Sequence, residues 1–319
     1  MIADPLPALL SHSFSRTDLF VVVYCEIDDW MIARYGSSNA PRRRRGPTPE
    51  QFSDAEVLTV LIVGELCQCP RERAWLRQVR ASYRGLFPRL PEDSRFSRRA
   101  EFVRMLLPCL RRAILAWADA DLEPFRILDS FPMPLCACYR IHQSSLPISG
   151  STFGYNSSKR CYYFGLHPQL VLTTSGFIEE IVLAPGNCND TPGLAFYLDQ
   201  CVEEGRDLSG QVWVMDKGYR NPQLVRWAKE RLGLTLVPRQ ADPKGEPRTF
   251  WNELLDATRK PIEGVVSVLT ECFGIEHMLV KTDVGLYRRI EAKATAFSLA
   301  RYFNRLLGLE SMNIARYAV

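Results

Sequence analysis

The first third of the chain repeats its apolar residues at helical spacing. Residues 18–35 place them every three or four positions, behind Ser15, which can cap a helix. Residues 53–68 begin with the serine and glutamate spacing of a capping box. Residues 71–86 and 97–118 continue the same period. The pattern therefore predicts four helices in an all-α region.

After residue 122 this periodicity gives way to short apolar runs bounded by turn residues, which are typical of strands. The predicted strands are 125–129, 162–166 continuing through 170–173, 177–184, 212–215 and 234–237, and helical patterns cover 192–204, 222–231 and the chain from 250 onward. Three strands that include a hairpin, followed by alternating helices and strands, predict a mixed sheet with helices on its faces. We therefore expect an all-α domain over 1–122 and an α/β domain over 123–319.

Composition excludes several classes of protein. In 319 residues that are 46% hydrophobic, no apolar run reaches the ~20 residues of a membrane span, and no secretory signal precedes the first helix. A cytoplasmic protein without a membrane partner is expected. No glycine-rich phosphate loop is present, so no nucleotide cofactor is implied. His142 and His167 have no serine or cysteine partner at a telling spacing, which disfavours a hydrolase built on a nucleophile and a histidine.

The basic residues are clustered although the net charge is only +4. Such a charge permits a nucleic-acid partner without requiring one. One cluster is an uninterrupted run in a predicted loop: Arg42, Arg43, Arg44 and Arg45. The other lies along the predicted helix 71–86 at spacings that share one face: Arg73, Arg77, Arg80 and Arg84. This stripe either contacts a phosphate backbone or forms a solvated outer face.

Two aspartates end apolar runs in the predicted sheet. Asp129 follows the first strand and Asp216 follows the fourth, so both carboxylates would project at one edge if those strands are neighbours. Glu263, in a later helical pattern, could pack across that edge. Three hard oxygen ligands suit Mg²⁺ or Mn²⁺, and two such ions ~3.5–4 Å apart would stabilise an in-line phosphodiester displacement. Taken singly, each acid could instead cap a turn or face a helix dipole.

Four segments around these acids carry a resemblance to a known family. They are 129–134, 154–160 with 163–166, 216–219, and Arg259 with 262–263. On these segments the chain resembles bacterial insertion-sequence transposases of the DDE type, nearest to insertion sequence family 982, over about residues 125–310. The resemblance implies a ribonuclease H-like catalytic domain over 123–319 and a helical domain over 1–122 that binds DNA or mediates dimerisation.

The resemblance also implies a function. Asp129, Asp216 and Glu263 would be the catalytic metal ligands, holding two Mg²⁺ or Mn²⁺ ions for cleavage at insertion-sequence ends and strand transfer into target DNA. Further DNA-binding residues would be Lys159, Arg160, Lys217, Tyr219 and Arg259. The partners would be double-stranded DNA, as terminal inverted repeats and target, and a second copy of the chain at the bacterial nucleoid. The alternatives are a related nuclease without strand transfer, or an inactive DNA-binding derivative.

Two local features leave alternatives open. Pro261 either starts the helix that carries Glu263, which would leave Arg259 outside it, or kinks a longer helix. Asp190 either supports the carboxylate site or caps the helix that follows from Pro192, and the pattern favours the cap.

Overall fold

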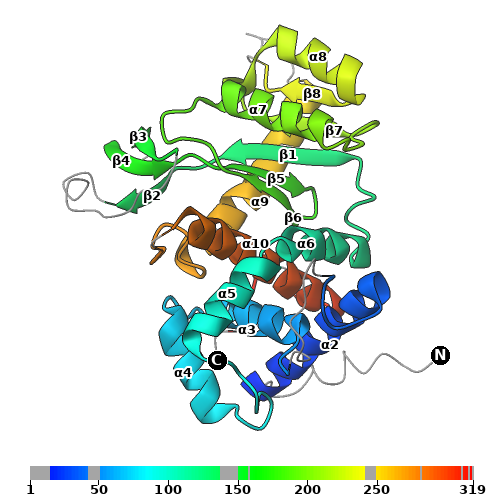
Figure 1. Ribbon diagram of the computed structural model, residues 1–319. Helices are drawn as coiled ribbons and strands as arrows, with labels where there is room; N and C mark the ends of the chain where they lie inside the picture. Colours follow the sequence, from blue (N-terminus) through cyan, green and yellow to red (C-terminus); the bar gives the residue numbers. More distant parts are fainter. Residues whose placement is uncertain are drawn as a thin grey trace. The chain divides into compact units, whose positions relative to one another are not determined.

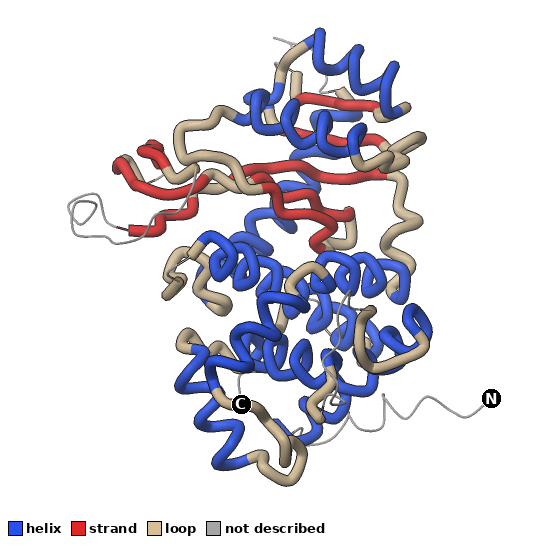
Figure 2. The backbone as a smooth tube through the Cα atoms, in the orientation of Figure 1, coloured by secondary structure: helices blue, strands red, loops and turns tan. Residues whose placement is uncertain are grey.

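The computed structural model describes residues 15–41, 51–136, 150–156, 159–240, 249–280, 282–309, 312–314 and 317. Contacts divide the chain into two compact units (Figures 1 and 2). The helical unit is Met1–Ala118 with Val268–Val319, and the sheet unit is Asp119–Ser267. The contacts thus group residues 268–319 with the first helices, whereas the sequence assigned them to the catalytic domain. No helix in the described part of the chain is long and apolar enough to cross a bilayer.

The helical unit contains most of the chain's helices. They are α2 (Arg16–Tyr35), α3 (Asp54–Leu66), α4 (Glu72–Ser82), α5 (Asp93–Val103), α6 (Leu106–Trp117) and α10 (Asp283–Leu306), while α9 (Phe250–Glu271) crosses the boundary between the units. Ser15 and Ser53 each form a capping box, and such a cap stabilises a helix by about 1 kcal/mol.

Two predicted helices have different ends in the structure. The predicted helix 97–118 is wrong as one element, because α5 ends at Val103 and α6 begins at Leu106. Pro108 explains the break, since it is tolerated in the first turn of α6 but would clash with a carbonyl inside a longer helix. Helix α4 ends at Ser82, so Arg84 lies in the turn that follows it.

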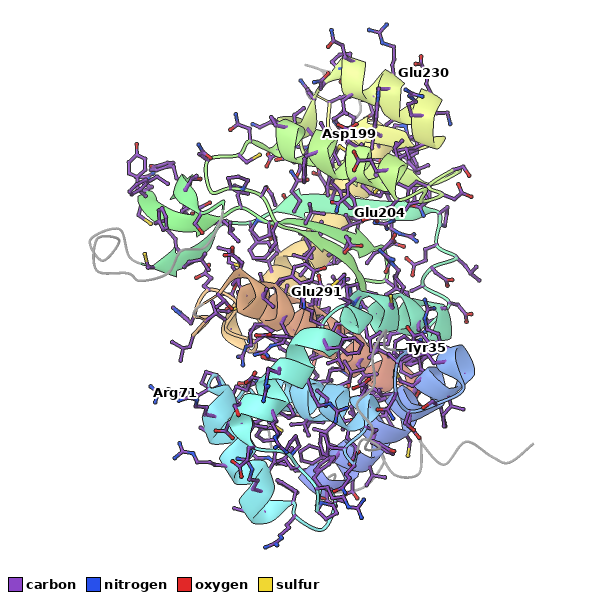
Figure 3. The ribbon with its side chains drawn as sticks, in the orientation of Figure 1. Tyr35, Arg71, Asp199, Glu204, Glu230 and Glu291 are labelled. Carbon is purple, nitrogen blue, oxygen red and sulfur yellow. The ribbon has the colours of Figure 1, made fainter. Side chains whose placement is uncertain are left out.

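Helix α10 forms the buried centre of the helical unit, where it packs against α3, α5 and α6 (Figure 1). It carries charged residues that are nearly inaccessible to solvent. Glu291, labelled in Figure 3, forms an ion pair with Arg111 in which both side chains are at most 1% exposed. Lys293 Nζ lies 2.6 Å from Glu65 on α3. Burial lowers the pKa of Lys293, and Glu65 opposes that shift.

The sheet unit is built on a five-stranded mixed sheet of order β6-β5-β1-β7-β8. Its strands are β1 (Phe125–Ser130), β5 (Gln169–Thr173), β6 (Ile178–Val182), β7 (Val212–Met215) and β8 (Thr235–Pro238). The β6-β5-β1 half is antiparallel and the β1-β7-β8 half is parallel. Helices α7 (Asp190–Glu203) and α8 (Pro222–Leu232) share an apolar core with this sheet. The predicted fold class, a ribonuclease H-like mixed sheet with helices after an all-α region, is confirmed.

A second, three-stranded sheet of order β2-β4-β3 was not predicted. Its strands are β2 (Met133–Cys136), β3 (Thr152–Asn156) and β4 (Cys161–Leu166). The predicted run 162–173 is therefore two strands in two different sheets, β4 and β5. Glycine is required where this small sheet is crowded: a Cβ at Gly165 would lie 2.2 Å from the carbonyl oxygen of Met133, and one at Gly154 would lie 2.3 Å from that of Gly186.

Candidate active site

Asp129 and Asp216 lie at the ends of the two central parallel strands. Strands β1 and β7 pair in register with Leu128 opposite Met215, and each acid is the next residue along the chain. Both side chains are partly exposed, above strand residues that are buried. A small cavity of about 20 Å³ is lined by Ile127, Leu128, Asp129, Val214, Met215, Asp216 and Ile262. The predicted juxtaposition of these two acids is present in the structure.

The local structure explains why each aspartate stays at this edge. Asp129 Oδ1 accepts the backbone N–H of Ser130 at 2.8 Å, so the carboxylate is oriented by its own neighbour. Asp216 follows β7 directly and is the N-cap of a short 3-10 helix, η2 (Lys217–Tyr219). Its backbone carbonyl accepts the Tyr219 N–H at 3.1 Å, which closes the turn.

Glu263 is carried to the same region by α9 but is not gathered with the aspartates. Its neighbour Ile262 is 3% exposed and lines the cavity, whereas the Glu263 side chain is exposed. Among the described residues, no three His, Cys, Asp or Glu side chains come close enough to hold a metal ion. Pro261 lies inside α9, so the alternative in which it starts the helix is wrong. Residue 259 is therefore one turn before Glu263 on a continuous helix.

Asp190 points toward the catalytic candidates. Ser130 follows Asp129 in the chain, and its hydroxyl donates to Asp190 Oδ1 at 2.7 Å. A Cβ at Gly218 would lie 2.4 Å from Asp190 Oδ2, so the carboxylate occupies the space that a side chain there would need. The N-cap of α7 is Asn189, and Asp190 is its first residue. The favoured prediction that Asp190 caps this helix is therefore wrong.

His167 completes a polar chain that the sequence did not reveal. Its Nε2 lies 2.9 Å from Ser130 Oγ, and its Nδ1 lies 3.3 Å from the Tyr163 hydroxyl. Because the single Ser130 proton points to Asp190, the Ser130 oxygen accepts from Nε2–H. Burial lowers the pKa of His167, and the charge of Asp190 opposes that shift. In this arrangement His167 donates to Ser130 and does not accept its proton, so His167 does not activate Ser130 as a nucleophile.

Tyr219 is buried beside the acids, with 1% of its surface exposed. Burial raises the pKa of its hydroxyl well above the ordinary value, and the negative charges of three carboxylates add to that increase: Asp190, Asp129 and Asp216. The Tyr219 hydroxyl therefore faces the acids as a protonated group. Its predicted contact with DNA stays a prediction.

The predicted DNA-binding cations occupy several surfaces. Lys159, Arg160 and Lys217 are exposed in the sheet unit. In the helical unit three of the stripe residues are exposed: Arg73, Arg77 and Arg84. Arg80 instead lies 2.8 Å from Asp93 and donates to the carbonyl of Pro91 at 2.7 Å. Arg71, labelled in Figure 3, projects outward at the start of α4 beside this stripe. The run 42–45 and the side chain of Arg259 lie outside the described residues.

A mixed sheet of this strand order, with carboxylates at the ends of its two central parallel strands, defines the ribonuclease H-like class of transposase fold. A family model described as "Transposase DDE domain" matches residues 121–299, more than half of the chain. The chain therefore belongs to the DDE transposase domain family, whose members are phosphoryl-transfer enzymes that act in DNA transposition. The match does not reach the level of insertion sequence family 982, which stays a prediction.

Of two further comparisons, one finds no match and the other finds a distantly similar structure. No curated protein matches the chain. Among solved structures, a cryo-EM structure of a piggyBac transposase synaptic complex with hairpin DNA is similar with a TM-score of 0.42 and 11% sequence identity, over 95% of this chain and 78% of that one.

Proposed function

We propose that this protein is a metal-dependent DNA transposase of insertion sequence family 982, which cleaves DNA at the ends of its element and joins them to target DNA. One observation carries the proposal. Asp129 and Asp216 lie at adjacent parallel strand ends and line the same cavity as Ile262, the neighbour of Glu263. Membership of the DDE transposase domain family supports a reaction at phosphodiester bonds.

The donor atoms fit a divalent cation with hard-oxygen preference. Carboxylates suit Mg²⁺ or Mn²⁺, and two like charges at one edge favour a cation between them. Asp129 and Asp216 would hold the ions, and Glu263 would complete the site by turning its exposed side chain toward them. Two bound ions would stabilise both the attacking and the leaving oxygen of the displacement.

The surrounding residues of the chain would keep the acids in place. Ser130 holds Asp190 through its hydroxyl and Asp129 through its backbone N–H. His167 fixes the orientation of that hydroxyl. Tyr219 is protonated at neutral pH, as an ordinary tyrosine is, and the raised pKa of its hydroxyl extends this to higher pH, so it would donate a hydrogen bond to a carboxylate or a phosphate oxygen.

Cations on both units would hold the DNA. Lys159, Arg160, Lys217 and Arg259 would contact phosphates near the acids, and the helical unit would bind element ends through Arg73, Arg77, Arg84 and the run 42–45. Two element ends must be held together before they join a target, so we propose a homodimer as the working form.

The test is a reaction of the purified protein with labelled DNA from the ends of its element and with Mg²⁺. We expect cleaved ends and joined strand-transfer products that require the metal. Cleavage without joining would instead assign a nuclease. Binding without either product would assign a DNA-binding derivative of a transposase.

A further inference from the structure

A large cavity opens in the sheet unit beside the candidate active site. Its volume is about 690 Å³, and it lies between the hairpin of β3 and β4 and the start of α7. Its lining includes Phe153, Tyr155, Tyr162, His167, Asp190 and Gly218. We propose that this cavity binds an unpaired DNA base during the reaction, an inference that rests on the proposed function.

The aromatic side of the cavity is unusually exposed. Phe153, Tyr155 and Tyr162 are 55%, 52% and 71% exposed. Tyr155 and Tyr162 are opposite each other across β3 and β4, with ring centroids 5.0 Å apart. Phe153 is two residues before Tyr155, so its side chain shares the same face of the sheet. Three large exposed aromatic rings on one face of the small sheet are typical of an interaction surface.

The cavity also offers polar groups that suit a base edge. Asp190 provides carboxylate oxygens that can accept from an exocyclic amino group, as acids do toward cytosine. Asn187 and Asn189, which also line the cavity, carry amides with both donors and acceptors. Lys159 and Arg160 are exposed in the turn that joins β3 to β4, next to the tyrosine pair. Rings, amides and cations together form the usual surface for single-stranded nucleic acid.

The cavity lies next to the proposed catalytic site. Asp190 lines the cavity and accepts the hydroxyl of Ser130, the residue after Asp129. Gly218, two residues after Asp216, lines it as well. A base held here would belong to a nucleotide close to the reacting phosphate. A base inside a duplex cannot stack on these rings because both of its faces are covered by its neighbours, so the proposed occupant is an unpaired nucleotide.

The proposal predicts a binding preference that can be measured without catalysis. The full-length protein, without a divalent metal, is titrated against a fluorescent blunt DNA duplex and against the same duplex with a short single-stranded overhang. Stacking on aromatic side chains is worth about 1–3 kcal/mol per base. We therefore expect about 5- to 150-fold tighter binding of the overhang duplex.

Variants then assign the preference to the rings. Tyr162→Ala and Tyr155→Ala should remove most of the preference and change binding of the blunt duplex by less than about twofold. Tyr162→Phe should keep the preference because the ring remains. Phe196→Ala is the matched control, since Phe196 is a 65% exposed ring on α7 that does not line the cavity. A circular dichroism spectrum verifies that each variant is folded.

The outcomes separate this inference from the proposed function. An overhang preference that Tyr162→Ala and Tyr155→Ala retain overturns the cavity as a base site. A wild-type protein that cleaves element ends with Mg²⁺ but shows no overhang preference overturns the inference and leaves the transposase proposal standing. Concentration-dependent dimerisation that Tyr162→Ala abolishes, with no overhang preference, would assign the rings to a second copy of the chain instead.

Discussion

The buried acids of the helical unit and the acids at the edge of the central sheet have different partners. In the helical unit Glu291 is enclosed with Arg111, and Glu65 contacts Lys293, so a cation of the protein accompanies each buried acid. At the edge of the central sheet Ser130 donates to Asp129 and to Asp190, through a backbone N–H and a hydroxyl that carry no charge. The first arrangement neutralises charge within the fold, and the second keeps negative charge concentrated.

This difference distinguishes acids that stabilise the fold from acids that are available to bind an ion or a substrate. A buried acid with a matched cation is costly to remove because its partner is left charged and desolvated. An acid among other acids raises the energy of the folded state, and it is retained where a substrate or an ion uses it. Removing a carboxylate should therefore have opposite consequences for stability in the core of the helical unit and at the sheet edge.

The largest effect is expected at the sheet edge. Asp129→Asn or Asp216→Asn should lower metal-dependent cleavage by about a thousandfold or more, since bound metal supplies several kcal/mol of transition-state stabilisation. The free energy of unfolding should not fall, because like charges are removed. Cleavage assays and urea denaturation measure the two quantities. Asp199→Asn, at an exposed position on α7 labelled in Figure 3, is the control that should change neither. If Asp216→Asn cleaves DNA as fast as the wild-type protein, Asp216 is not a metal ligand.

The opposite outcome is expected in the helical unit. Glu291→Ala leaves the 0% exposed guanidinium of Arg111 without its partner. The free energy of unfolding should fall by about 3–5 kcal/mol. Asp93→Ala, which breaks the partly exposed pair with Arg80, should cost only about 0–1 kcal/mol. Denaturation midpoints compare the variants, and equal losses at both sites would contradict the distinction.

An intermediate effect is expected where a glycine makes room for an acid. Gly218→Ala places a methyl group against Asp190 Oδ2 and should push that carboxylate away from Ser130. Cleavage should fall by about ten- to a hundredfold, the scale of an ångström-sized misplacement. Gly85→Ala is the control: a Cβ at Gly85 meets no atom within 4 Å, so the cleavage rate should not change. Gly210 would not serve, because its left-handed backbone makes any substitution there strained. Normal cleavage by Gly218→Ala would show that the position of Asp190 is unimportant.

The smallest effect concerns the arginine stripe on α4. If Arg77 contacts a phosphate, Arg77→Ala should weaken DNA binding and reduce the slope of log K against log salt by about 0.9. Arg80→Ala should change the slope less, because Asp93 already neutralises Arg80. Fluorescence anisotropy at several salt concentrations gives both slopes. Unchanged slopes in both variants would make the stripe a solvated surface.

The sequence predicted the part of the site that local pattern encodes. Asp129 and Asp216 each end an apolar run, so both were expected at one edge if their strands are neighbours, and the structure pairs those strands. The contacts of Ser130 were not predictable in this way, because Asp190 and His167 lie 60 and 37 residues away and no periodicity connects them. His167 carried no local signal beyond being a histidine near a strand end.

Two parts of the fold were hidden for identifiable physical reasons. The small sheet contains Pro134 and Gly154 inside its strands, and both residues normally indicate turns. Helix α10 was predicted as a helix, but its place in the helical unit was not, because its buried charged residues leave the sequence without a one-sided apolar face. Its partners, such as Arg111 on α6, are far away in the sequence and restore the balance only in the folded chain.

The helical unit consists of two segments that are far apart in the sequence, so its two parts emerge at different times during synthesis. Arg111 and Glu65 leave the ribosome early, while Glu291 and Lys293 follow 180 and 228 residues after their respective partners. The continuous segment Asp119–Ser267, with both strand-end aspartates and Glu263, emerges completely before α10 does. During synthesis the helical unit therefore cannot close before α10 has emerged, and a prematurely terminated chain that lacks α10 would carry the catalytic acids without a finished helical unit.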